Sequence, residues 1–302
     1  MTEQKWLRSS LRPLSQRLAA VGHQASAPTV RRLLHKLGYS LKANRKSREA
    51  GASHPDRNRQ FEYLETQKQA FLAAGWPVIS VDTKKKELIG DFKNPGQRWC
   101  REAAQVNTHD FPQDAQGRAV PYGIYDLQHN QGHVYVGNSG DTPEFAVTAI
   151  AHWWEETGQV LFPQATELLI LADSGGSNGC RPHAWKAQVQ SQLSDRLGLS
   201  VTVCHYPRGC SKWNPIEHRL FSHISLNWAG VPLRDWGTLL ACVRGTSTAS
   251  GLSVQAHLLE QVFETGQRVA KEVMKQLHLV HHEVCPRWNY TIQPRFLEPL
   301  VE

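Results

Sequence analysis

The sequence feature that most constrains the fold is a wholly apolar run, LLILA at residues 168–172, which ends at Asp173. An apolar run without alternation is typical of a central strand that is covered on both faces. A second short run, VISV at residues 78–81, is rich in β-branched residues and ends at Asp82. A strand that is buried on both faces needs helices packed above and below it, so these runs favour a layered α/β fold.

The rest of the chain from residue 58 alternates between strand and helix patterns. Residues 123–127 and 133–136 predict a hairpin, and residues 199–204 predict another apolar strand. Helices are expected after Asp56, over residues 142–158, over residues 182–197 and after Asn214. This order predicts a mixed sheet flanked by helices, and 302 residues with 40% hydrophobic content suffice for a substantial core.

Three acids occupy notable places in this order. Asp82 and Asp173 follow two apolar strands, and Glu217 lies on the first turn of a helix opened by Pro215. Side chains at the carboxyl ends of strands can converge at one edge of a sheet. Converging carboxylates repel one another unless a cation neutralises them, and hard divalent ions with oxygen ligands are the usual solution. For each acid taken singly, a turn-forming or capping role remains the simpler reading.

The positive charge is concentrated at the N-terminus. Residues 1–60 contain 13 Lys and Arg against 3 Asp and Glu, whereas residues 61–302 contain 21 and 24. A basic block on a nearly neutral protein is typical of nucleic-acid binding, because basic groups that neutralise phosphates release condensed counterions. A solvated basic tail would show the same charge.

Local patterning favours a helix-turn-helix in this basic block. Apolar residues recur at helical spacing before Gly22 and again between Ser26 and Gly38. The second helix would turn its polar side chains away from the apolar stripe, where they can meet phosphates or base edges. The candidate DNA contacts are Thr29, Arg31, Arg32, His35 and Lys36, with Arg45 and Lys46 in the basic run that follows. A purely structural pair of helices remains the alternative.

Small and polar residues then indicate a linker. The segment SREAGASHPDR at residues 47–57 contains glycine and proline and has no apolar stripe. The predicted organisation is therefore a helix-turn-helix segment at residues 1–46, a linker at 47–57 and an α/β domain at 58–302.

Several classes of protein are disfavoured. No stretch approaches the length of a membrane span, and no apolar signal core follows the N-terminus, so a cytoplasmic protein is expected. The six cysteines form no CxxC pair, which argues against a disulfide scaffold. One group could bind zinc, although its spacing favours a structural role: His278, His281, His282 and Cys285.

Three sequence blocks carry a resemblance to a known family. They are VDTKKKE at residues 81–87, LADSGGSN at 171–178 and SKWNPIEHRLF at 211–221. In this order they resemble the blocks of DDE transposases of the ISAzo-type insertion-sequence family. The likeness extends through HPDR at 54–57, YGIYD at 122–126 and WNYTI at 288–292, and so covers nearly the whole chain.

The resemblance implies an RNase H-like, retroviral-integrase-like fold and a catalytic triad of Asp82, Asp173 and Glu217. It implies that the protein binds two divalent metal ions, Mg²⁺ or Mn²⁺, as cofactors. The implied activity is DNA end cleavage and strand transfer. The implied partners are double-stranded DNA, in the form of terminal repeats and target, and further copies of the chain in a homodimer or larger assembly. Relative to the family, the N-terminal DNA-binding region looks shortened.

Cations that lie close to the acids in the sequence could bind DNA phosphates. Lys84 and Lys212 are the candidates for such contacts. Two readings compete with a transposase. One is a DNA-binding remnant or regulator whose triad does no chemistry, and the other is a nuclease of the same fold without joining activity.

Overall fold

The computed structural model describes residues 10–41 and 54–295. The chain divides into two compact units, Met1–Gly51 and Ala52–Glu302. The division falls inside the predicted linker. Arg45 and Lys46, together with residues 47–53 of that linker, lie outside the described residues.

The first unit is a pair of short helices, α1 (Leu11–Ala20) and α2 (Ala27–Lys36), that pack on each other. The hydroxyl of Ser26 accepts a hydrogen bond from the backbone N–H of Thr29, which caps α2 as the sequence predicts. Gly22 has a φ of 87°, so the turn between the helices uses a backbone conformation that favours glycine. The helix, turn and helix expected from the sequence are thus present.

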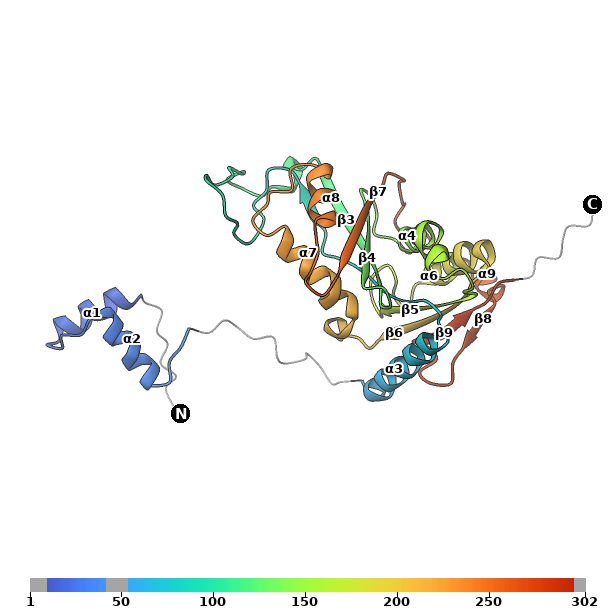
Figure 1. Cartoon of the computed structure of the whole chain (residues 1–302), viewed down its shortest axis with the longest axis horizontal. Coiled ribbons are helices and arrows are strands. Elements are labelled where there is room, and N and C mark those ends of the chain that lie inside the picture. Colours follow the sequence, from blue (N-terminus) through green and yellow to red (C-terminus); the bar gives the residue numbers. More distant parts are fainter. Residues whose placement is uncertain (1–9, 42–53, 296–302) are drawn as a thin grey trace, which may run out of the picture. The chain divides into compact units, whose positions relative to one another are not determined.

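Among the described residues of the second unit, nine strands form one sheet (Figure 1). They are β1 (Val78–Thr83), β2 (Glu87–Ile89), β3 (Gly117–Asp126), β4 (Gln131–Gly137), β5 (Glu167–Asp173), β6 (Ser200–Tyr206), β7 (Ser253–Leu259), β8 (Leu279–His281) and β9 (Asn289–Ile292). The order across the sheet is β7-β4-β3-β1-β5-β6-β9-β8, and β2 pairs with β3 outside this path. The strand β1 is parallel to β5 and antiparallel to β3, so the sheet is mixed.

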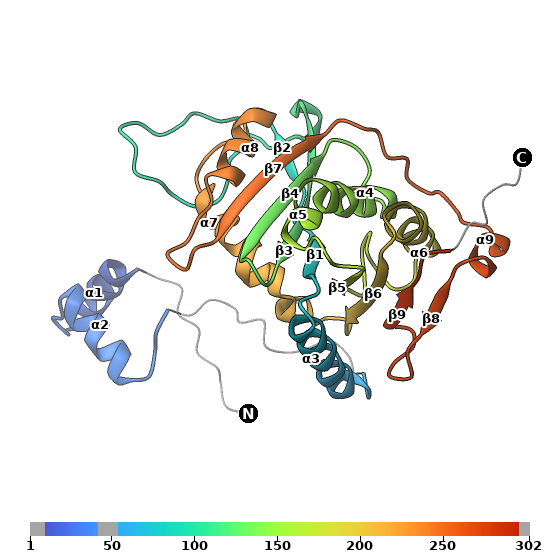
Figure 2. The same cartoon turned by 45° about the vertical axis from the view of Figure 1, so that its right-hand side comes forward.

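Helices cover both faces of this sheet (Figure 2). Neighbouring residues of β5 face opposite layers: Ile170 packs in the cluster with α4 (Pro143–Trp153) and α6 (His183–Gln188), whereas Leu171 packs in the cluster with α3 (Arg57–Ala73). This explains why the run at residues 168–172 is apolar without alternation. The predicted mixed sheet flanked by helices is confirmed.

The remaining helices complete the layers. The half of the sheet formed by β3, β4 and β7 is covered on one face by α7 (Ser222–Asn227), α8 (Trp236–Arg244) and the wide helical turn Glu217–Phe221. Two further wide turns, Trp154–Gly158 and Val189–Asp195, extend α4 and α6, and the former leads into α5 (Gln159–Leu161). The short α9 (Lys271–Lys275) precedes β8. No helix in the described parts of the chain is long and apolar enough to cross a membrane.

A buried amide pair fixes α3 to the C-terminal hairpin of β8 and β9. Gln60 and Asn289 are both 0% exposed, and each donates to the other's amide oxygen at 2.7 Å. Their second N–H groups are also used, since Gln60 donates to the carbonyl of His205 at 2.9 Å and Asn289 to that of Val284 at 2.7 Å. All four amide hydrogens therefore have acceptors away from water.

We expect Asn289→Leu to lower the free energy of unfolding by roughly 2–3 kcal/mol, because it leaves the amide oxygen and one N–H of Gln60 buried without partners. The double variant Gln60→Leu/Asn289→Leu should lose less than the sum of the two single variants, since it removes both polar groups together. Urea unfolding followed by circular dichroism measures these differences. Additive losses would show that the two amides do not depend on each other.

Candidate active site

The first two acids are brought together by the pairing of β1 with β5. Val81 is aligned with Ala172 in this parallel pair, so Asp82 and Asp173 follow at the same end of neighbouring strands. Asp82 is aligned on its other side with Gly123 of β3. The strand register therefore places the two aspartates at one edge of the sheet, where the sequence predicts them.

The third acid is brought in by close packing against β3 and β4. A side chain at Gly123 would meet the Phe221 ring at 2.5 Å and Ile216 at 2.9 Å, and one at Gly132 would meet Leu220 at 2.4 Å. The turn Glu217–Phe221 thus lies directly on backbone that carries no Cβ. This contact sets Glu217 beside the strand ends of the other two acids.

Asn214 connects all three acidic segments. Its side chain is 0% exposed, and its amide nitrogen donates to an Asp173 carboxylate oxygen at 3.2 Å and to the Val81 carbonyl at 3.4 Å. Its amide oxygen accepts a hydrogen bond from the Ser80 hydroxyl, and that hydroxyl accepts from the backbone N–H of Ile216 at 3.1 Å. One buried amide therefore holds the ends of β1 and β5 and the start of the Glu217 turn in fixed positions.

Burial disfavours the charged form of each acid, and neighbouring acids add to this effect at Asp82 and Asp173. Burial, followed by the charge of Asp173 and more weakly that of Glu217, raises the pKa of Asp82 to about 8. Burial and the charge of Glu217 raise the pKa of Asp173 to about 6, although the Asn214 hydrogen bond acts in the opposite direction. Burial also raises the pKa of Glu217. These carboxylates form a site that favours a cation.

Lys84 is a buried cation whose charge acts on this cluster. Its side chain is 9% exposed, and its ammonium lies 4.5 Å from the centre of the Trp228 ring and 3.8 Å from a Glu87 carboxylate oxygen. The charge of Lys84 lowers the pKa of Glu217, against the effect of burial. This burial favours a role as a counter-charge to Glu217 over the direct DNA contact expected from the sequence.

The donor set fits a divalent metal ion. Three carboxylates from separate elements, each with a raised pKa, supply the oxygen ligands that Mg²⁺ and Mn²⁺ prefer. Among the described residues, however, no group of three or more His, Cys, Asp and Glu side chains is already drawn into one ligand shell. The acids are thus close enough to interact through their charges without being closed into a complete site.

A fourth acid, Asp141, was missed in the sequence. The Thr83 hydroxyl lies 3.1 Å from an Asp141 carboxylate oxygen and 3.2 Å from the Ser177 hydroxyl, and the charge of Asp141 contributes to the raised pKa of Asp82. The ammonium of Lys86 lies 3.3 Å from the other Asp141 oxygen. In the sequence, Asp141 is marked only by its position one residue before the helix cap Thr142. Acids are common at such positions, so this position does not indicate a functional residue.

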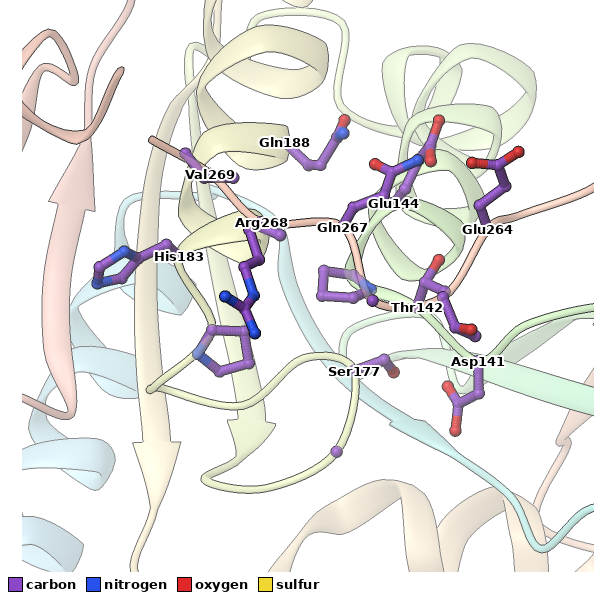
Figure 3. Close-up of a pocket in the computed structure, with 16 residues that line it drawn as sticks. Asp141, Thr142, Glu144, Ser177, His183, Gln188, Glu264, Gln267, Arg268 and Val269 are labelled. Carbon is purple, nitrogen blue, oxygen red and sulfur yellow. The ribbon is translucent and has the colours of Figure 1, made fainter. Parts of the chain in front are cut away.

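Asp141 and Ser177 also line a pocket of about 560 Å³ (Figure 3). Figure 3 shows Glu144 and Glu264 near its other end, and Arg268 reaching toward it from the segment between β7 and α9. The pocket therefore extends the acidic surface of the site along the start of α4.

The candidate DNA contacts of the first unit lie on α2. The side chains of Arg31, Arg32, His35 and Lys36 are exposed, whereas the Thr29 hydroxyl lies 3.0 Å from that of Ser26 and serves the helix cap. These residues belong to the first unit, whereas the three acids belong to the second.

Lys212 lies just before the third acid. Its ammonium is 5.2 Å from the centre of the Trp213 ring, which is 54% exposed, and its carbonyl oxygen contacts the ring of His218. Lys212 therefore keeps an exposed charge on the segment that leads into Glu217, as a phosphate contact requires.

The histidine group near the C-terminus has separate partners. The two ring nitrogens of His282 bond the Tyr63 hydroxyl at 2.7 Å and the Thr291 hydroxyl at 2.8 Å, and His281 bonds the Pro286 carbonyl at 2.6 Å. His278 bonds the Pro294 carbonyl at 3.2 Å. These bonds support the structural role that the spacing favours over zinc binding.

Comparison with known sequences places this arrangement in a family. The model of a family described as "Rhodopirellula transposase DDE domain" matches residues 1–294. The chain belongs to this family of DDE transposases. The DDE transposase family expected from the sequence is thereby confirmed, whereas the RNase H-like class and the roles of the individual acids stay predictions. Among curated proteins, none matches the chain.

Solved structures with a similar fold include three Mos1 complexes. The Mos1 transposase paired-end complex with left transposon end has 12% identity, covers 77% of this chain and has a TM-score of 0.43. The Mos1 mariner paired-end complex with Mn has 12% identity, the same coverage and a TM-score of 0.44. The Mos1 Strand Transfer Complex has 12% identity, covers 79% of this chain and 71% of its own, and has a TM-score of 0.44. The chain spans 64% of the length of each of the first two, and likenesses this slight say nothing further about its site.

The raised pKa of Asp82 predicts a pH-dependent stability. Between about pH 4 and pH 8 the metal-free folded protein binds a proton that the unfolded chain has released. The free energy of unfolding should therefore fall as pH rises through this window, by up to about 1.4 kcal/mol per pH unit for one group. Added Mn²⁺ should raise the melting temperature more at pH 8 than at pH 6, because protons compete with the metal.

Thermal unfolding with EDTA or Mn²⁺ measures both effects. Asp82→Asn should flatten the pH dependence and remove most of the stabilisation by Mn²⁺, whereas the matched variant Asp110→Asn, at an exposed acid, should change neither. An unaltered pH slope in Asp82→Asn would contradict the assignment.

Asn214 should act on metal affinity through Asp173. We expect Asn214→Ala to weaken Mn²⁺ binding by roughly 10- to 100-fold, the loss typical when a partner that orients a metal ligand is removed. Calorimetric titration measures this loss, and Asn227→Ala, at an exposed asparagine, is the matched control. Unchanged affinity in Asn214→Ala would show that Asp173 is held by other contacts.

Proposed function

We propose that this protein is an insertion-sequence transposase that cleaves the ends of its element and transfers them into target DNA with the help of divalent metal ions. The observation that carries the proposal is the meeting of Asp82, Asp173 and Glu217 at one end of the sheet, with each pKa raised. Membership of a DDE transposase family supports it independently.

In this proposal the three acids hold two Mg²⁺ or Mn²⁺ ions, which would activate the attacking oxygen and stabilise the leaving oxygen of a phosphodiester. The chain's own residues fix where this happens. Asn214 orients the Asp173 carboxylate, and the backbone N–H of Thr83 donates to Asp82 at 2.8 Å. The buried Lys84 balances part of the charge of Glu217. Positioning of this kind matters because phosphoryl transfer depends mainly on orientation and on charge stabilisation.

The proposed substrate is double-stranded DNA, held by two parts of the chain. Residues 1–46 would bind the terminal repeat through Arg31, Arg32, His35 and Lys36, and the linker 47–57 would join them to the catalytic part 58–302. Lys212 would contact phosphates next to the acids. Because two element ends must be handled together, we place the protein in a homodimer or larger assembly on DNA.

Replacing single acids tests the chemistry. The substrate is the DNA that flanks the gene and contains the ends of the element, and the assay contains Mn²⁺. Nicking and strand transfer should each fall by at least ~10²-fold in Asp82→Asn, Asp173→Asn and Glu217→Gln. Each variant should still bind the DNA, because binding relies on other residues. Gel analysis of end-labelled DNA follows nicks and joined products in one assay.

The matched control is Glu102→Gln at an exposed acid, which should keep full activity. A wild-type protein that shifts the DNA but never nicks it with any divalent ion would instead be a DNA-binding remnant. A wild-type protein that nicks without joining would be a nuclease.

A further inference from the structure

A second, larger cavity begins at the loop that follows Asp173. It has a volume of about 1090 Å³, and Ser174, Gly175 and Gly176 form the part nearest the acid. At Gly175 and Gly176 an added Cβ would meet no atom within 4 Å, so the loop opens onto free space. The cavity therefore continues directly from the end of β5, where the second acid lies.

The side chains that line the rest of this cavity are strongly basic. Arg181, Arg208 and Arg287 are exposed, and none of them forms an ion pair or a hydrogen bond with a side chain in residues 10–41 or 54–295 that would balance its charge. The one carboxylate in the lining, that of Asp56, lies 3.8 Å from the ring of His54. The cavity thus carries a surplus of positive charge although the body of the protein is slightly acidic.

A buried ammonium strengthens this surplus. Lys186 is 7% exposed and lines the cavity, and its Nζ donates to the Cys180 carbonyl at 2.6 Å and lies 5.0 Å from the centre of the Tyr290 ring. No carboxylate in the described parts of the chain pairs with it. A cation removed from water without a counter-ion is costly, so an anion in the cavity would relieve that cost.

The size and shape of the cavity indicate what kind of anion it takes. A volume of about 1090 Å³ lies at the upper end of the range for small-molecule sites, and its three arginines come from three separate segments, which follow β5, follow β6 and connect β8 to β9. An extended polyanion can use several cations at once, since each phosphate can meet its own cation. The Trp288 ring, 4.7 Å from that of His54, adds an aromatic surface on which a base can stack.

We propose that this cavity binds the phosphodiester backbone of the DNA strand that runs past the cleaved bond, with Gly175 beside the acids and with Arg181, Arg208 and Arg287 contacting phosphates. This inference rests on the proposed function. It assigns to the catalytic unit a DNA contact of its own, separate from the contacts of residues 1–46. The cavity therefore acts only on DNA that extends beyond the end of the element.

The test compares two DNA molecules. One is a terminal duplex that stops at the cleavage position, and the other carries about ten additional nucleotides of flanking DNA. Binding of the full-length protein in EDTA is measured by fluorescence anisotropy over a range of salt concentrations. For the wild type, the extension should tighten binding by at least ~10-fold. The slope of log K against log salt concentration should also become steeper by about 2–3, because each phosphate contact adds close to one unit of slope.

The variant Arg181→Gln/Arg208→Gln/Arg287→Gln should bind the short duplex as the wild type does, but gain less than about one unit of slope from the extension. The matched control Lys93→Gln/Arg101→Gln/Arg118→Gln removes the same charge at exposed positions outside the cavity and should behave as the wild type. All six positions are exposed, so folding should be unaffected, and melting temperatures check this.

The outcomes separate the two proposals. If the wild type neither binds the terminal duplex nor nicks it with Mn²⁺, the proposed function fails. If the wild type nicks DNA but the cavity variant keeps the full gain from the extension, the cavity inference is overturned and the transposase proposal stands. Equal losses in the cavity variant and the control would also overturn the inference, because they would reflect net charge alone.

Discussion

The structure depends on holding like charges close together at one end of a sheet. Burial raises the pKa of Asp82, Asp173 and Glu217. The charges of Asp173 and Glu217 raise the pKa of Asp82 further, and the charge of Glu217 raises that of Asp173, so this repulsion has to be offset by contacts elsewhere. The buried amide of Asn214 offsets part of it by bonding the Asp173 carboxylate and both neighbouring segments. Because the β1 and β5 backbones are buried on both faces, the acids cannot relax apart without breaking the sheet. The strain is therefore kept at the site, where a metal ion can relieve it.

A second consequence concerns how the site is divided among elements. Two acids are fixed by strand register, which tolerates little movement. The third depends on side-chain packing, in which Phe221 and Leu220 lie on Gly123 and Gly132. The Glu217 turn is also a wide helical turn, a form often found at functional sites. Closure of the three acids into one metal shell therefore requires adjustment of this turn more than of the strands.

The sequence predicted those parts of the fold and the site that depend on local pattern. The runs at residues 78–81 and 168–172 predict their strands because their apolar side chains face two layers, and the aspartates at their ends follow from that. The strands β7, β8 and β9 were not predicted. The strands β8 and β9 have only three and four residues, and most residues of β7 are exposed or half-buried. In addition, β7 and β9 pair with the distant strands β4 and β6. The contribution of Asn214 and the burial of Lys84 against Trp228 also could not be predicted, since both depend on contacts between segments more than 100 residues apart.

Charge distribution links the two halves of the proposed mechanism. Residues 61–302 contain 24 acidic and 21 basic residues, so this body as a whole does not attract DNA. Within it, however, acids gather at the ends of β1 and β5, while uncompensated cations gather in the cavity beyond Gly176. A DNA strand lying across both regions is attracted by the cavity and repelled by the acids until metal ions neutralise them. Metal binding and DNA binding at this site should consequently favour each other, because each removes an electrostatic cost that the other would meet.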